Sequence, residues 1–162
     1  MIAAKKLLIL GGLALIILGM SYGLYFAVFV EHQTLDGIGG SLATSFIRAA
    51  ERKSSESQTA LDAYAETKFV YTRQVDLHSH WIGLGMLLMV LGAVFERVAF
   101  ADRFRFLLAL ALLAGAATFP FGVLLETFDS GPIPRAVAIV GSGLIIASLG
   151  AVVLGFARQS EP

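Results

Sequence analysis

The chain contains no cysteine, and this absence removes several kinds of site at once. Without thiolates it cannot form disulfides, thiolate zinc sites, all-cysteine iron–sulfur clusters or covalent c-type haem attachments. Any metal would have to be held by nitrogen, oxygen or thioether sulfur. The sequence also lacks a phosphate-binding loop, a nucleophile elbow, a zincin motif and a dinucleotide fingerprint, so it designates no catalytic residue.

Charge is scarce as well. Only 15% of the 162 residues are charged, whereas 57% are apolar and the mean hydropathy is +0.79. This composition is typical of a membrane protein rather than of a soluble domain. The 12 basic residues balance the 12 acidic ones, so no overall field favours a nucleic-acid partner.

The apolar residues are concentrated in long runs. We place membrane spans at about residues 7–30, 78–98, 104–126 and 135–157, each near the roughly 20 residues that cross the hydrocarbon of a bilayer. Backbone hydrogen bonds must close within each segment in lipid, and no strand alternation is visible, so the spans should be helices. The predicted fold is all-α: one polytopic membrane domain over residues 1–162, a four-transmembrane-helix bundle whose first span is retained rather than cleaved.

Basic residues flank the spans on one side. They are Lys5, Lys6, Arg97, Arg103, Arg105 and Arg158. By the positive-inside rule, both termini should lie in the cytoplasm of a bacterial-type inner membrane. Residues 31–77 are then extracytoplasmic. We expect the glycines at 37, 39 and 40 to mark a turn, and weak apolar stripes to form two short amphipathic helices over the outer mouth of the bundle. The alternative is a solvated loop.

Small residues recur at helical spacing within the spans, and such residues mark contacts between helices in lipid. The predicted faces contain Gly19 and Gly23; Gly85 and Gly92; Gly115 and Gly122; and Ala138, Gly141, Ser148 and Gly155. Packing between the four spans accounts for most of them. A face for self-association, giving a homo-oligomer, or for a partner subunit is the other interpretation.

All three histidines fall where the first two spans meet the outer boundary. His32 follows the first apolar run, and His78 and His80 open the second. Glu126 ends the third run at the same expected depth. These four residues predict a zinc or copper site by ligand type, and the three histidines alone predict a haem b site. Because residues two apart lie about 200° apart on a helix, His78 is the better candidate to point into the bundle.

The histidine segment resembles, over a short stretch, the low-spin haem helix of haem–copper oxidases and nitric oxide reductases. The shared features are the His78-Ser79-His80 entry and the following Gly83-Leu84-Gly85. The chain lacks the many helices of those enzymes, so the resemblance assigns no family. Three other interpretations stay open: structural histidines, a proton relay or quinone contact, and a pH sensor.

Two functions are therefore expected. In the first, an integral membrane protein holds a metal or haem at its extracytoplasmic boundary through histidines. It would serve in electron transfer with a quinone or partner, or in metal handling. In the second, the protein is a non-catalytic structural or assembly subunit of a larger membrane complex.

Overall fold

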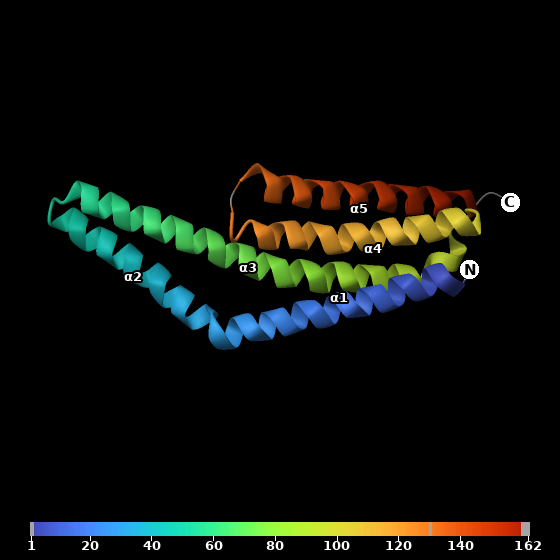
Figure 1. The fold of residues 1–162 in the computed structure, drawn as a ribbon, viewed down its shortest axis with the longest axis horizontal. Helices are drawn as coiled ribbons and strands as arrows, with labels where there is room; N and C mark the ends of the chain where they lie inside the picture. Colours follow the sequence, from blue (N-terminus) through green and yellow to red (C-terminus); the bar gives the residue numbers. More distant parts are fainter. Residues whose placement is uncertain (1, 130, 160–162) are drawn as a thin grey trace.

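The computed structural model describes residues 2–129 and 131–159, and every element in this part of the chain is helical. The elements are α1 (Ile2–Phe29), α2 (Glu31–Ala50), α3 (Ser54–Val94), the 3₁₀ turn η1 (Phe95–Arg97), α4 (Asp102–Leu125) and α5 (Pro132–Gln159). Figure 1 shows both termini at one end of the molecule and the α2–α3 turn at the other. We call these the terminus side and the hairpin side.

Four of the helices are long and apolar enough to cross a membrane, as the sequence predicts. These candidate spans are Ala3–Phe29, Ser54–Arg97, Asp102–Leu125 and Pro132–Arg158. The second is much longer than a bilayer requires, because α3 continues beyond its apolar half. The protein is therefore an all-helical membrane protein with four candidate spans.

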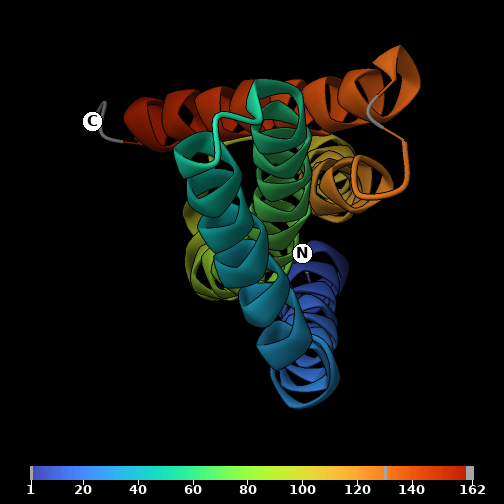
Figure 2. The ribbon, with the colours of Figure 1, turned by 90° about the vertical axis from the view of Figure 1, so that its left-hand side faces the viewer.

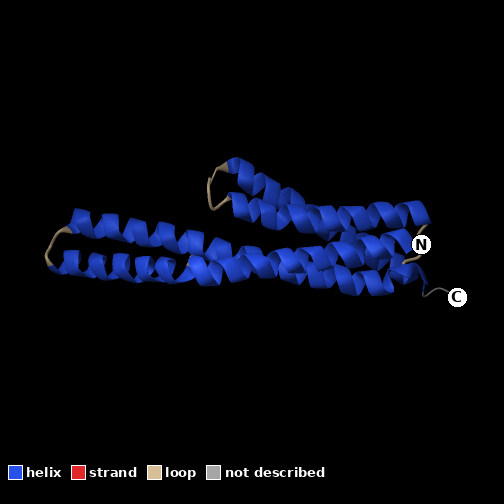
Figure 3. Ribbon diagram, turned by 60° about the horizontal axis from the view of Figure 1, so that its bottom comes forward, coloured by secondary structure: helices blue, strands red, loops and turns tan. Residues whose placement is uncertain are grey.

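The segment between the first two spans differs from the prediction. In place of two short helices covering the bundle, the structure has the 20-residue α2 and a 41-residue α3 whose first half pairs with α2. The two helices form a hairpin that projects away from the spans (Figures 1 and 3). At 1.5 Å per residue, α2 is about 30 Å long. The hairpin therefore extends the molecule by a distance close to the thickness of the hydrocarbon layer.

The turn of this hairpin lies at Glu51–Lys53. The amide of Lys53 donates to the carbonyl of Arg48 at 2.9 Å, and the amide of Arg52 donates to the carbonyl of Ala49 at 3.0 Å. Arg52 has a φ of 60°, in the left-handed region. These bonds form a Schellman motif, which satisfies the last carbonyls of α2 and reverses the chain.

The spans form an open layer rather than a closed bundle. The backbone of α1 packs along α3, and α4 packs on both of them. Among the helical elements of the described residues, the backbone of α5 comes close only to α4 and η1. The amide of Ala99, in the α3–α4 connection, also donates to the carbonyl of Gly155 on α5 at 3.0 Å. The end-on view in Figure 2 shows α5 and α1 on opposite sides of the layer. α4 continues as one helix through Pro120.

The predicted small-residue faces lie at the contacts between spans. A Cβ on Gly85 would lie 2.6 Å from the carbonyl oxygen of Gly12, and a Cβ on Gly122 would lie 2.4 Å from the amide nitrogen of Ala138. The backbones approach so closely there that a side chain does not fit. Between these contacts the core is filled by large residues that are fully buried, among them Leu8, Leu77, Leu88, Phe95 and Leu112.

Candidate functional site

His32 lies in the first turn of α2, outside the layer of spans. Its side chain is 91% exposed, and its Nε2 atom lies 3.6 Å from a carboxylate oxygen of Asp36. This spacing of i and i+4 allows an ion pair within the helix when the imidazole is protonated. The ring is therefore directed into the surroundings of the hairpin rather than toward the other histidines.

His78 faces α1, on the small-residue face where the sequence placed it. A Cβ on Gly23 would lie 3.2 Å from Cδ2 of His78, so the glycine leaves room for the ring. Nδ1 of His78 lies 3.1 Å from the carbonyl oxygen of Gln74. A carbonyl oxygen can only accept, so Nδ1 is the donor in this hydrogen bond.

His80 faces α4 instead. Its ring meets that of Phe119 edge-on, with the ring centroids 4.8 Å apart. Its Nδ1 lies 2.6 Å from the carbonyl oxygen of Asp76, so this ring also donates from Nδ1 to its own helix. The two histidines thus contact different neighbouring helices, as the helical period requires.

Glu126, immediately after α4, lies in an ion pair. Its carboxylate is 2.9 Å from Nε of Arg73 on α3, and its side chain is only 11% exposed. Nη1 of the same guanidinium lies 3.8 Å from Asp76. The Arg73 guanidinium also stands over the ring of Phe69, 5.1 Å from its centroid. Glu126 therefore connects the end of α4 to α3 and has a cationic partner already.

The four predicted ligands are not brought to one point. Among residues 2–129 and 131–159, no group of three histidine, aspartate or glutamate side chains lies where it could hold one metal ion. His32 is at the surface, His78 is against α1, His80 is against α4, and Glu126 is paired with Arg73. The ligand roles of these residues stay predictions.

Sequence reasoning missed Arg73. It lies in the predicted extracytoplasmic segment 31–77, and no role was predicted for it from the sequence. The continuation of α3 places Arg73, Asp76 and His80 on the face toward α4, at spacings of three and four residues. The sequence contained one indication of this ion pair. Glu126 ends the third span at the expected outer boundary of the membrane, and a carboxylate at that depth usually has a partner.

The hairpin presents a second surface of interest. Between Gly37 and Ala50 on α2 there is a single charged residue, Arg48. Phe46 is 67% exposed and Ile47 is 58% exposed. Gly39 and Gly40 are part of the same helix, and a Cβ on either would meet no atom within 4 Å. A helix that meets only water normally carries charged residues along its outer face. We call the exposed residues Gly39, Gly40, Ala43, Phe46 and Ile47 the α2 surface.

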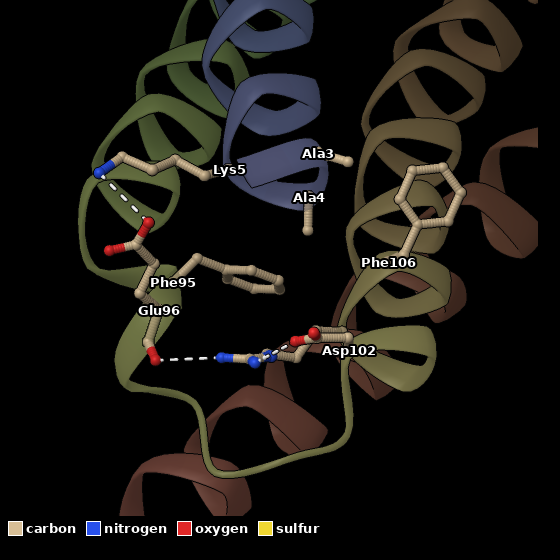
Figure 4. Close-up of a pocket in the computed structure, with 8 residues that line it drawn as sticks. Ala3, Ala4, Lys5, Phe95, Glu96, Asp102 and Phe106 are labelled. Carbon is tan, nitrogen blue, oxygen red and sulfur yellow. Dashed lines mark hydrogen bonds and ion pairs between the residues drawn. The ribbon is translucent and has the colours of Figure 1, made fainter. Parts of the chain in front are cut away.

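A small cavity lies on the terminus side, between α1 and the α3–α4 connection (Figure 4). Its volume is about 40 Å³. Lys5 reaches Glu96 at 3.7 Å, and Arg105 donates to the backbone carbonyl of Glu96 at 3.1 Å and to the carboxylate of Asp102. Through these contacts the first turns of α1 and α4 are both bound to η1. The polar groups at the cavity are thus paired largely with one another, as expected for structural anchors.

The chain was compared with protein-family models, with curated proteins and with solved structures, and none of the three comparisons finds a match.

Proposed function

We infer that the protein is a non-catalytic subunit of a larger membrane complex, in which the spans anchor a helical arm that binds a partner. The observation that carries this proposal is the continuity of α3. One helix of 41 residues runs from the hairpin turn into the membrane layer. A partner held by the hairpin would be fixed in height and orientation relative to the bilayer.

The α2 surface supports this function. A contiguous exposed apolar patch outside the spans commonly marks a surface that another molecule covers. Phe46 and Ile47 lie one turn from the hairpin turn, and Gly39 and Gly40 leave the helix backbone accessible. Aromatic and apolar anchors beside small residues suit the close approach of another helix, from a partner subunit or from a second copy of the chain.

The proposal also includes the orientation of the chain in the membrane. The basic flanks of the spans favour a bacterial-type inner membrane with both termini in the cytoplasm and the hairpin on the extracytoplasmic side. Reporter fusions test this placement. Alkaline phosphatase inserted at Ser54 should be active, whereas the same enzyme fused after Arg158 should be inactive. The reverse result would place the hairpin in the cytoplasm.

The partner role is tested by the double variant Phe46→Asp/Ile47→Asp. Complexes isolated from the native membrane in mild detergent should lose their co-purifying subunits, or their dimer, in this variant. Thr59→Asp, an exposed position on the other helix of the hairpin, is the matched control and should retain them. If the double variant keeps its full set of partners while folding normally, the α2 surface is not the binding surface.

A metal or haem function is the second candidate, and the ring orientations of two histidines favour it. His78 and His80 both donate from Nδ1 to a backbone carbonyl, and metal-binding histidines are commonly oriented in this way, with Nε2 left as the ligand atom. A visible spectrum and elemental analysis of the purified protein test the idea. A Soret band or a bound metal that disappears in His78→Ala supports a ligand role. The absence of both favours the structural subunit.

A further inference from the structure

Tyr71 on α3 marks the level at which the first span ends on the hairpin side. The ring of Phe26 lies 5.8 Å from that of Tyr71, and the Tyr71 hydroxyl donates to Glu31 at 3.2 Å. Phe26 is still in the apolar run of α1, and Glu31 is the first residue of α2. The head-group layer of a bilayer is about 5–7 Å deep on each side. It therefore surrounds α3 at Tyr71 and for a few residues from Tyr71 toward the hairpin turn.

An open groove lies on α3 at this level. It is lined by Tyr64, Ala65, Lys68, Phe69, Thr72 and Arg73. Lys68 lies three residues beyond Tyr71, which is about 4.5 Å along a helix, so its ammonium group is in reach of the head-group layer. The groove is on a face of α3 that α2 leaves open.

The two cations of the groove differ in how far they are neutralised. Arg73 faces Glu126 at 2.9 Å and Asp76 at 3.8 Å. The ammonium of Lys68 instead donates to the hydroxyl of Tyr64 at 3.2 Å and lies 5.5 Å from the centre of its ring. Within residues 2–129 and 131–159, no carboxylate forms an ion pair with Lys68. Lys68 is therefore a cation without an anionic partner at the level of lipid phosphates.

An uncovered face of α3 continues from the groove into the membrane. Its residues are Lys68, Thr72, Ser79, Gly83, Met86 and Val90, and all of them are exposed. At 100° per residue these positions fall within about 60° of arc, so they form one straight strip along the helix. Met86 is 53% exposed and Val90 is 66% exposed, while a Cβ on Gly83 would meet nothing within 4 Å.

We propose that this face of α3 is a binding site for an anionic glycerophospholipid of the leaflet on the hairpin side. The phosphate group lies against the ammonium of Lys68, and one acyl chain follows the strip from Ser79 to Val90. Charge complementarity selects the anionic head group, because Lys68 has no internal counter-ion. The smooth surface at Gly83 lets the chain lie close to the helix. This site is independent of the partner-binding role of the α2 surface.

Native mass spectrometry of the full chain tests the proposal, with dioleoylphosphatidylglycerol titrated into the detergent-purified protein. Lys68→Gln should weaken binding about fivefold, as expected for one basic residue at a membrane surface. Lys53→Gln is the matched control, because Lys53 is at the hairpin turn and already pairs with Glu51 at 3.0 Å. It should bind as the unmodified chain does. Equal affinity of Lys68→Gln and Lys53→Gln would overturn the site.

A second variant tests the acyl chain separately from the charge. Gly83→Leu places a side chain in the strip at a position where a Cβ meets no atom within 4 Å, and it should also weaken lipid binding. Two further measurements complete the test. Dioleoylphosphatidylcholine should bind more weakly than the anionic lipid, and inorganic phosphate at the same concentration should not compete. Full binding by Gly83→Leu, equal binding of the two lipids, or competition by phosphate would each contradict the proposal.

Discussion

Gly12 on α1 and Gly85 on α3 face each other across a close backbone contact in the first pair of spans. A Cβ on Gly12 would lie 2.5 Å from the carbonyl oxygen of Gly85, and a Cβ on Gly85 would lie 2.6 Å from that of Gly12. Neither backbone can move aside to make room for a side chain unless the two helices separate. This contact fixes how α1 is aligned with α3 and so sets the level at which the hairpin leaves the membrane.

Gly85→Ala should therefore destabilise the protein. The added methyl group meets backbone atoms, and overpacking of this kind typically costs about 1–3 kcal/mol. Unfolding in mixed micelles with increasing dodecyl sulfate measures the change. Gly83→Ala is the matched control on the same helix, because its Cβ meets no atom within 4 Å. Equal stability of the two variants would show that α1 and α3 are not packed as described.

The Arg73–Glu126 pair should contribute to the attachment of α4 to α3. Glu126 is the more buried member of the pair, and Glu126→Gln leaves the half-buried Arg73 guanidinium with only Asp76 at 3.8 Å, so we expect a loss of about 1–2 kcal/mol. Glu66→Gln, which changes an exposed glutamate of α3, serves as the control in the same unfolding assay. The exchanged pair Arg73→Glu/Glu126→Arg should recover part of the loss. No loss in Glu126→Gln would mean that the pair is dispensable.

Arg52 offers a substitution that should stabilise the hairpin. Its φ of 60° is a conformation that glycine adopts without the steric cost borne by other residues. Arg52→Gly is expected to stabilise the hairpin by about 1 kcal/mol, and Arg52→Val to destabilise it. Hydrogen exchange of the α2 and α3 amides near the turn measures both effects. If these amides are less protected from exchange in Arg52→Gly than in the unmodified chain, the Schellman geometry of the turn is contradicted.

Acid should loosen the same turn. Hydrogen bonds from Lys53 and then from Arg48 lower the pKa of Glu51 in the folded protein. Because the folded pKa is the lower one, the contribution of Glu51 to stability is complete above the ordinary glutamate pKa of about 4.3 and is lost as pH falls through the folded pKa. Hydrogen exchange near the turn should accelerate in that acidic window. In Glu51→Gln this part of the pH dependence should disappear.

The membrane layer was predictable because long apolar runs leave few alternatives to a spanning helix. Small residues at helical spacing also located the contact faces, as Gly85 and Gly122 illustrate. The helical period likewise separates His78 and His80, which contact Gly23 and Phe119 respectively. These features depend on local periodicity, which a single sequence contains.

The hairpin was not predictable in the same way. Gly37, Gly39 and Gly40 were interpreted as a turn, but they lie inside α2. Glycine in a helix costs up to about 1 kcal/mol relative to alanine, and pairing with α3 compensates for it. The polar residues after Lys53 concealed the true start of α3. The spatial positions of His32 and Glu126 then depend on this hairpin, so the sequence could not show that they lie apart.

The continuity of α3 from the hairpin into the membrane is the claim on which the proposed function rests. It is tested most directly by pulsed electron–electron double resonance on Gln58→Cys/Ser79→Cys. Both positions are exposed on α3, and the chain has no other cysteine to label. An unbroken helix predicts one narrow distance distribution centred near about 32 Å, from 1.5 Å per residue. A broad distribution, or one centred well below this distance, would show that α3 breaks between the hairpin and the span.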